Sequence, residues 1–193
     1  MRIFFPILNP ADILALIIFF SKSLLRHPIA RSSIEEFTGD SQFKWIIEDP
    51  EHGNSINDHD SIDRVVLCTG QVYAALHKHR ADSGIKDTAI TRIEQLNPFP
   101  WEQLKENLDS YPNAKTIVWC QEEPLNAGAW SFTQPRIETL LNNTEHHDRK
   151  HVMYAGRNPS ASVATGLKAS HTKEEKELLE TAFSVTQDKL KGE

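Results

Sequence analysis

The architecture of this chain is constrained most by residues 115–130, Lys-Thr-Ile-Val-Trp-Cys-Gln-Glu-Glu-Pro-Leu-Asn-Ala-Gly-Ala-Trp. Residues 115–120 are apolar and rich in β-branched and aromatic side chains, which predicts a buried strand. Residues 130–141 predict a helix. The connection between them holds two carboxylates, a proline, an asparagine and a glycine. In open α/β sheets, ligands and partner subunits usually meet the carboxyl ends of the strands, so this connection is a candidate site.

Two interpretations of this connection stay open. In the first it is only a turn, in which Pro124 and Gly128 shape the loop and Asn126 caps the helix. In the second it is an interface, for which the candidate residues are Glu122, Glu123, Asn126 and Trp130. A glutamate pair is costly to bury alone, so at least one carboxylate should meet a cation or backbone N–H groups.

The same alternation of strand and helix extends along the chain. Apolar runs predict strands at 64–69, 88–93 and 151–155, and helical spacing predicts helices at 71–80, from Pro100 onwards, and from Thr172 onwards. Shorter signals predict a helical turn at 33–37, a strand at 43–47 and a surface loop at 49–63. This order predicts an α/β fold with an open, largely parallel sheet and helices on both faces.

Composition limits the class of protein. The chain has 193 residues and a net charge of −6, so it fits one domain and lacks the basic excess that nucleic-acid binding requires. Cys68 and Cys120 each lie in an apolar run, which predicts buried thiols. The apolar run at 13–20 is shorter than the roughly twenty residues of a membrane span, so we expect no membrane partner. Residues 1–20 also show no Arg-rich, amphipathic mitochondrial presequence.

Three polar clusters invite functional interpretations. Residues 146–151, His-His-Asp-Arg-Lys-His, could suggest a metal site, but a solvated loop is the favoured interpretation. Residues 156–166 lack the spacing of a phosphate-binding loop and predict an ordered loop over the sheet edge, with Arg157 as a candidate partner for an anion or carboxylate. A basic cluster that includes Arg26 and Arg31 predicts either interdomain ion pairs or a shared anion site.

Several motifs occur in a family-like order: Val-Val-Leu-Cys-Thr-Gly-Gln-Val-Tyr at 65–73, Arg-Ile-Glu-Gln-Leu-Asn-Pro-Phe-Pro at 92–100, Trp-Cys-Gln-Glu-Glu-Pro-Leu-Asn-Ala-Gly-Ala-Trp at 119–130, and Tyr-Ala-Gly-Arg-Asn-Pro-Ser-Ala-Ser at 154–162. Together with Lys-Ser-Leu-Leu-Arg-His-Pro at 22–28, they resemble the C-terminal domain of the thiamine-diphosphate-dependent decarboxylating component of the 2-oxoglutarate dehydrogenase complex. The resemblance covers roughly residues 22–185.

The resemblance implies a domain organisation. Residues 62–186 would be a C-terminal domain of the transketolase type, and residues 22–61 a linker that leaves a pyrimidine-binding domain. Residues 1–21 would be an apolar leader foreign to the family, and residues 187–193 a charged tail. We expect residues 1–20 to come from an intron or a misplaced start codon.

The resemblance also implies a function. The family enzyme belongs to the tricarboxylic acid cycle, in the mitochondrial matrix of eukaryotes. It decarboxylates 2-oxoglutarate oxidatively and passes a succinyl group to the lipoyl arm of an acyltransferase component. It acts as a homodimer with thiamine diphosphate and Mg²⁺, which other domains bind. No catalytic, cofactor-binding or metal-binding residue can be carried over, so this chain alone is expected to bind no cofactor and to be inactive. Three alternatives stay open: a free-standing interaction module, a gene-model fragment, and a fragment of the paralogue that acts on 2-oxoadipate.

Overall fold

A computed structural model describes residues 21–148 and 150–185, and the chain divides into two units, residues 1–44 and 45–193. In the first unit the described residues form three short 3-10 helices: η1 (Lys22–Arg26), η2 (Pro28–Ala30) and η3 (Ile34–Phe37). The helical turn predicted at 33–37 is therefore confirmed. The predicted charged tail at 187–193 and all but the last residue of the predicted leader at 1–21 lie outside the described residues.

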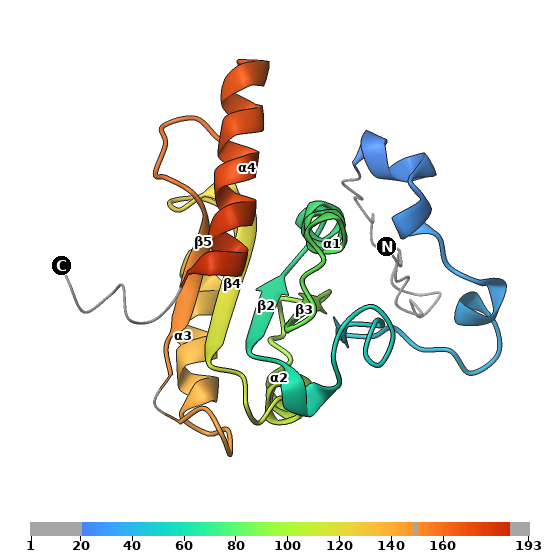
Figure 1. Ribbon diagram of the computed structural model, residues 1–193. Coiled ribbons are helices and arrows are strands. Elements are labelled where there is room, and N and C mark those ends of the chain that lie inside the picture. The colour runs from blue at the N-terminus through green and yellow to red at the C-terminus, as the bar shows by residue number, and fades with distance from the viewer. Residues whose placement is uncertain (1–20, 149, 186–193) are drawn as a thin grey trace, which may run out of the picture. The chain divides into compact units, whose positions relative to one another are not determined.

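The second unit contains a five-stranded sheet in the order β1-β3-β2-β4-β5 (Figure 1). The strands are β1 (Ile46–Ile47), β2 (Arg64–Cys68), β3 (Thr88–Ile93), β4 (Thr116–Pro124) and β5 (Val152–Arg157). All neighbours pair in parallel except β1, which runs antiparallel to β3. The prediction of an open, largely parallel sheet is confirmed.

Among the described residues of this unit, four α-helices cover the sheet in two layers. They are α1 (Val72–Ser83), α2 (Trp101–Asp109), α3 (Trp130–Leu141) and α4 (Lys168–Ser184). Helix α1 contacts α4, and α2 contacts α3, so one pair lies on each face, as Figure 1 shows for α3 and α4 beside β5. The predicted start of the last helix at Thr172 is wrong. Its first turn forms earlier because the His171 N–H donates to the Leu167 carbonyl at 3.0 Å.

Burial on both faces explains why the strand sequences are continuously apolar. The side chains of Ile117, Val118, Trp119 and Cys120 on β4 are all fully buried, although successive residues point to opposite faces. Cys68 and Cys120 are paired in register on β2 and β4, and both are free buried thiols, as predicted. Burial raises the pKa of the Cys68 thiol well above its usual range and that of Cys120 to about 12.

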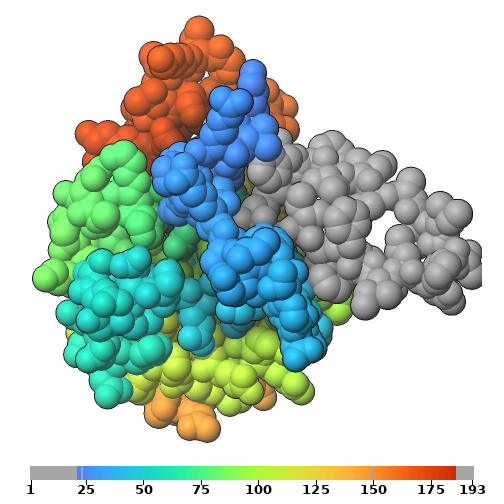
Figure 2. Space-filling model, turned by 90° about the vertical axis from the view of Figure 1, so that its right-hand side faces the viewer, coloured from blue at the N-terminus to red at the C-terminus, as the bar shows by residue number. Residues whose placement is uncertain are grey.

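The segment 49–63 is more than the surface loop that its polar sequence predicted. Ile56 and Ile62 belong to the hydrophobic core, and Asp49 is buried. The compact unit itself begins at Trp45, whose carbonyl accepts the N–H groups of Glu94 and Gln95, and not at residue 62. Figure 2 shows the segment, in cyan, on the surface between α1 and α2.

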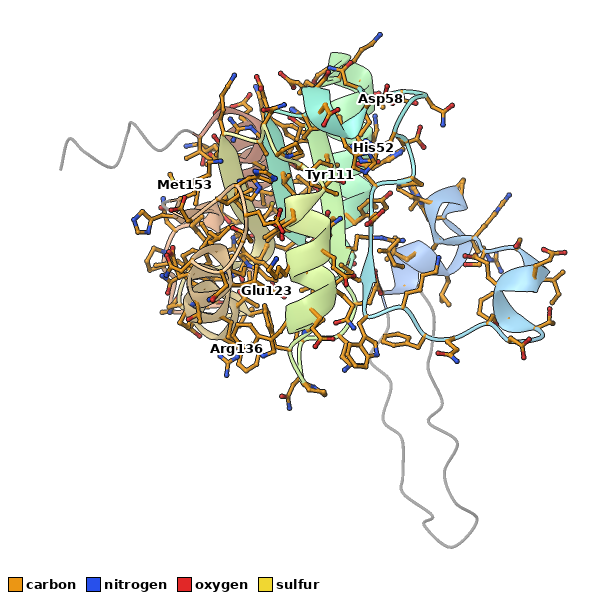
Figure 3. The ribbon with its side chains drawn as sticks, turned by 90° about the horizontal axis from the view of Figure 1, so that it is seen from below. His52, Asp58, Tyr111, Glu123, Arg136 and Met153 are labelled. Atoms are coloured by element: carbon orange, nitrogen blue, oxygen red, sulfur yellow. The ribbon has the colours of Figure 1, made fainter. Side chains whose placement is uncertain are left out.

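A histidine fixes this segment to the chain that follows α2. His52 and Tyr111 lie side by side in Figure 3, with His52 Nε2 2.8 Å from the tyrosine hydroxyl. His52 Nδ1 is 3.0 Å from the Asn57 carbonyl oxygen, which can only accept, so Nδ1 donates there. The ring of His59 stacks on His52 at 3.9 Å between centroids. Burial raises the pKa of Tyr111.

The solvated loop predicted for residues 146–151 is wrong at His147. This side chain is completely buried, with Nε2 2.9 Å from the Leu108 carbonyl and Nδ1 2.8 Å from Lys150 Nζ. The loop folds back onto the end of α2, so a polar sequence supplies one core residue. Within residues 21–148 and 150–185, no group of three His, Cys, Asp or Glu side chains is arranged to hold a metal ion.

We expect His147 to make stability depend on pH. Burial lowers its pKa from the ordinary 6.5, and the neighbouring Lys150 lowers it further, whereas the hydrogen bond to Leu108 opposes the shift. The unfolded chain therefore binds the proton more readily, so the free energy of unfolding is greatest above pH 6.5 and falls as the pH drops below it.

Urea titrations at several pH values between 5 and 8 measure this effect, with those limits set roughly to bracket an ordinary histidine pKa. His147→Gln should flatten the pH dependence of the free energy of unfolding below pH 6.5. The matched variant of its exposed neighbour, His146→Gln, should leave this pH dependence unchanged. The same slope in wild type and His147→Gln would contradict a buried neutral histidine.

Candidate functional site

Strand β4 runs beyond its predicted end at residue 120 and reaches Pro124. The register between β4 and β5 shifts between Cys120 and Pro124, after which Pro124 pairs with Arg157. The Leu125 N–H then donates to the Arg157 carbonyl at 3.0 Å. The glutamate pair therefore lies within the strand and not in a loop after it, because β5 continues to supply backbone partners.

Gln121 organises the turn that follows β4. Its Oε1 accepts from Trp119 Nε1 at 3.1 Å and from the Trp130 backbone N–H at 2.9 Å. Its Nε2 donates to the carbonyls of Glu123, Pro124 and Ala127 at 2.8–3.2 Å. One buried amide thus fixes both ends of the turn. Gln121 is absent from the predicted site residues, although a polar side chain directly after a buried strand is the signal that could have identified it.

The turn needs a glycine at position 128, which confirms its predicted role. Gly128 has a φ of +68°, and a Cβ there would lie 2.9 Å from the Glu123 Cβ. Asn126 does not cap α3 as predicted, because the N-cap position is Ala129 and carries no side-chain cap. The Asn126 amide instead forms two hydrogen bonds with the backbone of Ser160, both at 3.0 Å. It joins the turn to the loop after β5.

Trp130 is half-buried at the start of α3. Its ring lies 5.1 Å from that of Tyr154 on β5, measured between centroids. The Tyr154 hydroxyl donates to the Arg157 carbonyl at 3.0 Å, and burial raises the pKa of this hydroxyl to about 12. The aromatic pair anchors the turn against β5 and leaves part of the indole accessible to a partner.

The two glutamates have different surroundings. Glu122 accepts from Gln71 Nε2 at 2.6 Å, and burial raises the pKa of its carboxyl, with smaller contributions from Glu123 and Glu175. The hydrogen bond from Gln71 and the nearby His171 oppose this rise. Glu123 is exposed. At Glu122 a side-chain amide within this chain takes the place of the expected cation or backbone N–H groups.

Arg157 is nine-tenths buried at the end of β5. Its guanidinium pairs with Glu174 on α4, and Nη1 donates to the Val163 carbonyl at 2.7 Å. It borders a polar cavity of about 670 Å³, which is lined by Gly156, Arg157, Asn158, Pro159, Ser160, Ser170, Lys173, Glu174, Glu177 and Thr181. Its carboxylate partner therefore comes from within the domain.

The other two candidate arginines are exposed. Arg26 ends η1 and Arg31 follows η2, so both belong to the first unit, whereas Arg157 belongs to the second. The anion site predicted for Arg26 and Arg31 stays a prediction. In the part of the chain that the structure describes, no helix has the length and apolarity that crossing a membrane demands.

Comparison with known proteins places this arrangement in a family. Residues 31–183 match the family model described as 2-oxoglutarate dehydrogenase C-terminal. The chain is 55% identical over 168 residues to the mitochondrial 2-oxoglutarate dehydrogenase of Saccharomyces cerevisiae, which covers 87% of this chain and 16% of the yeast protein. It is 54% identical over 169 residues to the enzyme of the same name from Schizosaccharomyces pombe, with the same two coverages.

A mammalian relative gives the same result at lower identity. The mitochondrial 2-oxoglutarate dehydrogenase-like protein of Rattus norvegicus is 40% identical over 171 residues, which cover 88% of this chain and 16% of the rat protein. The chain therefore spans about one sixth of the length of these relatives. On the family match and these identities, the chain belongs to the 2-oxoglutarate dehydrogenase C-terminal family.

Proposed function

We propose that this chain serves as the C-terminal assembly domain of a thiamine-diphosphate-dependent, homodimeric 2-oxoglutarate dehydrogenase. The observation that carries the proposal is the family match over residues 31–183. The complete enzyme would oxidatively decarboxylate 2-oxoglutarate in the tricarboxylic acid cycle and pass the succinyl group to the lipoyl arm of an acyltransferase component. The relatives' names favour a mitochondrial enzyme and favour 2-oxoglutarate over 2-oxoadipate as its substrate.

The residues of this chain do not fit the cofactor site. The sequence has no Gly-Asp-Gly motif, which holds the diphosphate and Mg²⁺, so its Asn-Asn pair at 142–143 has no such motif before it. Thiamine diphosphate supplies the carbanion chemistry of the family reaction, and other domains would bind it. The proposed role of this chain is therefore to position and join subunits, and the chain alone is proposed to be inactive.

The end of β4 and the start of α3 are the proposed contact with a partner subunit. Burial already disfavours the charged form of Glu122, so a cationic side chain from a partner would stabilise its carboxylate. Glu123 is exposed beside it, and the half-buried Trp130 offers an apolar ring for the centre of a contact. Gln121 and Asn126 hold this surface in one conformation, which reduces the entropy lost on association.

A chimeric enzyme tests this function. Residues 22–193 would replace the matching C-terminal region of the Saccharomyces cerevisiae enzyme, to which the chain is 55% identical. We expect a dimer that reduces ferricyanide with 2-oxoglutarate when thiamine diphosphate and Mg²⁺ are added. Glu123→Ala with Trp130→Ala should weaken dimerisation at least about tenfold, as expected when a hot-spot residue is lost. Analytical ultracentrifugation and the ferricyanide assay measure the two effects.

The controls separate assembly from folding. The same double substitution should weaken dimerisation by more than it destabilises the isolated chain, because Glu123 is exposed and Trp130 is only half-buried. A folded chimera that stays monomeric would reject the assembly role. A stability loss in the isolated chain equal to the loss in dimer affinity would mean that Trp130 is only a packing residue.

A further inference from the structure

Lys150 and His147 form a hydrogen-bonded pair in the loop between α3 and β5. Lys150 Nζ lies 2.8 Å from His147 Nδ1 and 3.2 Å from the His146 carbonyl oxygen. His147 Nε2 lies 2.9 Å from the Leu108 carbonyl oxygen at the other side of the ring. The histidine is completely buried and the lysine is half-buried, so the amine lies at the edge of the core.

The hydrogen bonds assign the proton on the histidine ring. The Leu108 carbonyl can only accept, so Nε2 carries the ring proton and donates to it. In the neutral ring Nδ1 then presents its lone pair to Lys150 Nζ. Burial lowers the pKa of His147, and the positive charge of Lys150 lowers it further, which favours this neutral form. His147 is thus a base whose orientation is set by a third group, the Leu108 carbonyl.

The surroundings of Lys150 make its ammonium group easier to deprotonate. Burial lowers the pKa of the ammonium group, an effect that the charge of Asp148 opposes. A neutral amine has two N–H groups, and the structure provides two acceptors, His147 Nδ1 and the His146 carbonyl. Loss of the third proton therefore breaks neither of these hydrogen bonds and frees a lone pair for an electrophile.

We propose that Lys150 is a nucleophilic lysine that becomes acylated by acyl thioesters, with His147 as its general base. The nucleophile lies within hydrogen-bond distance of the base, and the base lies within hydrogen-bond distance of its orienting carbonyl, as in other activated nucleophiles. The choice of a thioester rests on the proposed function, because the family reaction transfers a succinyl group as a thioester. The reactivity of Lys150 rests on the contacts alone.

The reaction balances without an oxidant or a reductant. The Nζ lone pair attacks the thioester carbonyl carbon, a C–N bond forms, and the carbonyl becomes a tetrahedral oxyanion. His147 Nδ1 accepts the proton that the nitrogen then loses. Collapse of the oxyanion breaks the C–S bond, and the thiolate leaves with the proton that the histidine releases. The products are an amide on Lys150 and a free thiol.

Two exposed lysines on α4 provide an internal comparison. Lys173 and Lys176 are 76% and 74% exposed, and each forms an ion pair with a glutamate one helical turn away. Neither ion pair contains a histidine that could accept a proton from the lysine. Because all three lysines belong to one chain, they report relative reactivity in a single digest.

The test is acylation of the 193-residue chain by S-acetyl-N-acetylcysteamine, a small acyl thioester, without 2-oxoglutarate or thiamine diphosphate. Mass spectrometry of peptides gives the rate at each lysine. We expect Lys150 to react at least about a hundredfold faster than Lys173 and Lys176, the lower end of the range for general-base catalysis. His147→Gln, with folding verified by circular dichroism, should reduce the Lys150 rate to theirs.

A chain unfolded in urea is the second control. There the three lysines should react at similar rates, because the contacts with His147 and the His146 carbonyl are lost. Equal rates in the folded wild-type chain would overturn the proposal, even if His147→Gln fails to fold. A folded His147→Gln variant that keeps the fast rate would equally overturn it. Neither outcome bears on the assembly function, which the chimeric dimer tests separately.

Discussion

Replacing Arg80 by methionine is expected to lower the free energy of unfolding by about 3–5 kcal/mol, the usual result of removing one partner of a buried ion pair. Arg80 on α1 and Asp49 are each at most 4% exposed. The guanidinium binds both carboxylate oxygens and donates to the Thr88 carbonyl at 3.1 Å. Methionine would leave the Asp49 charge buried with no cation beside it.

Asp49 has further contacts that make this loss large. Its oxygens accept from the backbone N–H of Ile90 at 2.7 Å and from that of Glu51 at 3.1 Å. The ion pair therefore connects the segment before β2 to α1 and to β3. Because the carboxylate is held from several sides, it cannot move to water without disrupting the core.

Lys78→Met is the matched control for Arg80→Met. Lys78 lies on the same helix and pairs with Asp82, but the two side chains are 75% and 64% exposed. Its loss should change stability by no more than about 0.5 kcal/mol, as for other surface pairs. Urea unfolding at neutral pH measures both variants. Losses of similar size would contradict a buried, fully paired Asp49.

Replacing Gln121 by alanine is expected to cost about 2–4 kcal/mol of stability. The change leaves the Trp119 indole N–H and the Trp130 backbone N–H without an acceptor, and each orphaned buried donor costs about 1–3 kcal/mol. Gln121→Glu should be similarly destabilising, because a carboxylate would face the carbonyls that Nε2 now binds. Thermal and urea unfolding give the values.

Gln71→Ala is the comparison for Gln121→Ala. Gln71 is exposed and makes one side-chain contact, the donation to Glu122. Its loss should cost no more than about 1 kcal/mol, since an exposed hydrogen bond exchanges readily with water. A Gln121→Ala variant as stable as Gln71→Ala would show that water satisfies the two tryptophan donors. The turn would then be held by its backbone alone.

The sequence alone predicted the class of the fold well. The strands β2 and β3, helix α3 and the parallel order of the sheet agree with the predicted elements, and β4 agrees at its beginning. Apolar runs and helical spacing are local signals, and continuous apolar strands already indicate a sheet covered on both faces. The motifs that follow these strands also identified the family, which the match over residues 31–183 bears out.

The candidate site was predicted only in part. The sequence located the turn after β4 and the need for glycine at 128, because a tight turn has a local chemical signature. It missed the length of β4 and the role of Asn126, since both depend on β5 and on the loop after it. The two Asn126 hydrogen bonds join residues 34 positions apart in the chain.

Arg80, His147 and Lys150 illustrate what only the tertiary structure decided. Each lies in a polar stretch that predicts exposure, yet Arg80 contacts a carboxylate 31 positions away and His147 a carbonyl 39 positions away. A polar side chain becomes buried when distant segments pack over it and supply hydrogen-bond partners, and no local pattern records that event. The sequence thus determined the layers of this domain, whereas the packing between them selected which polar groups became paired, buried and chemically distinct.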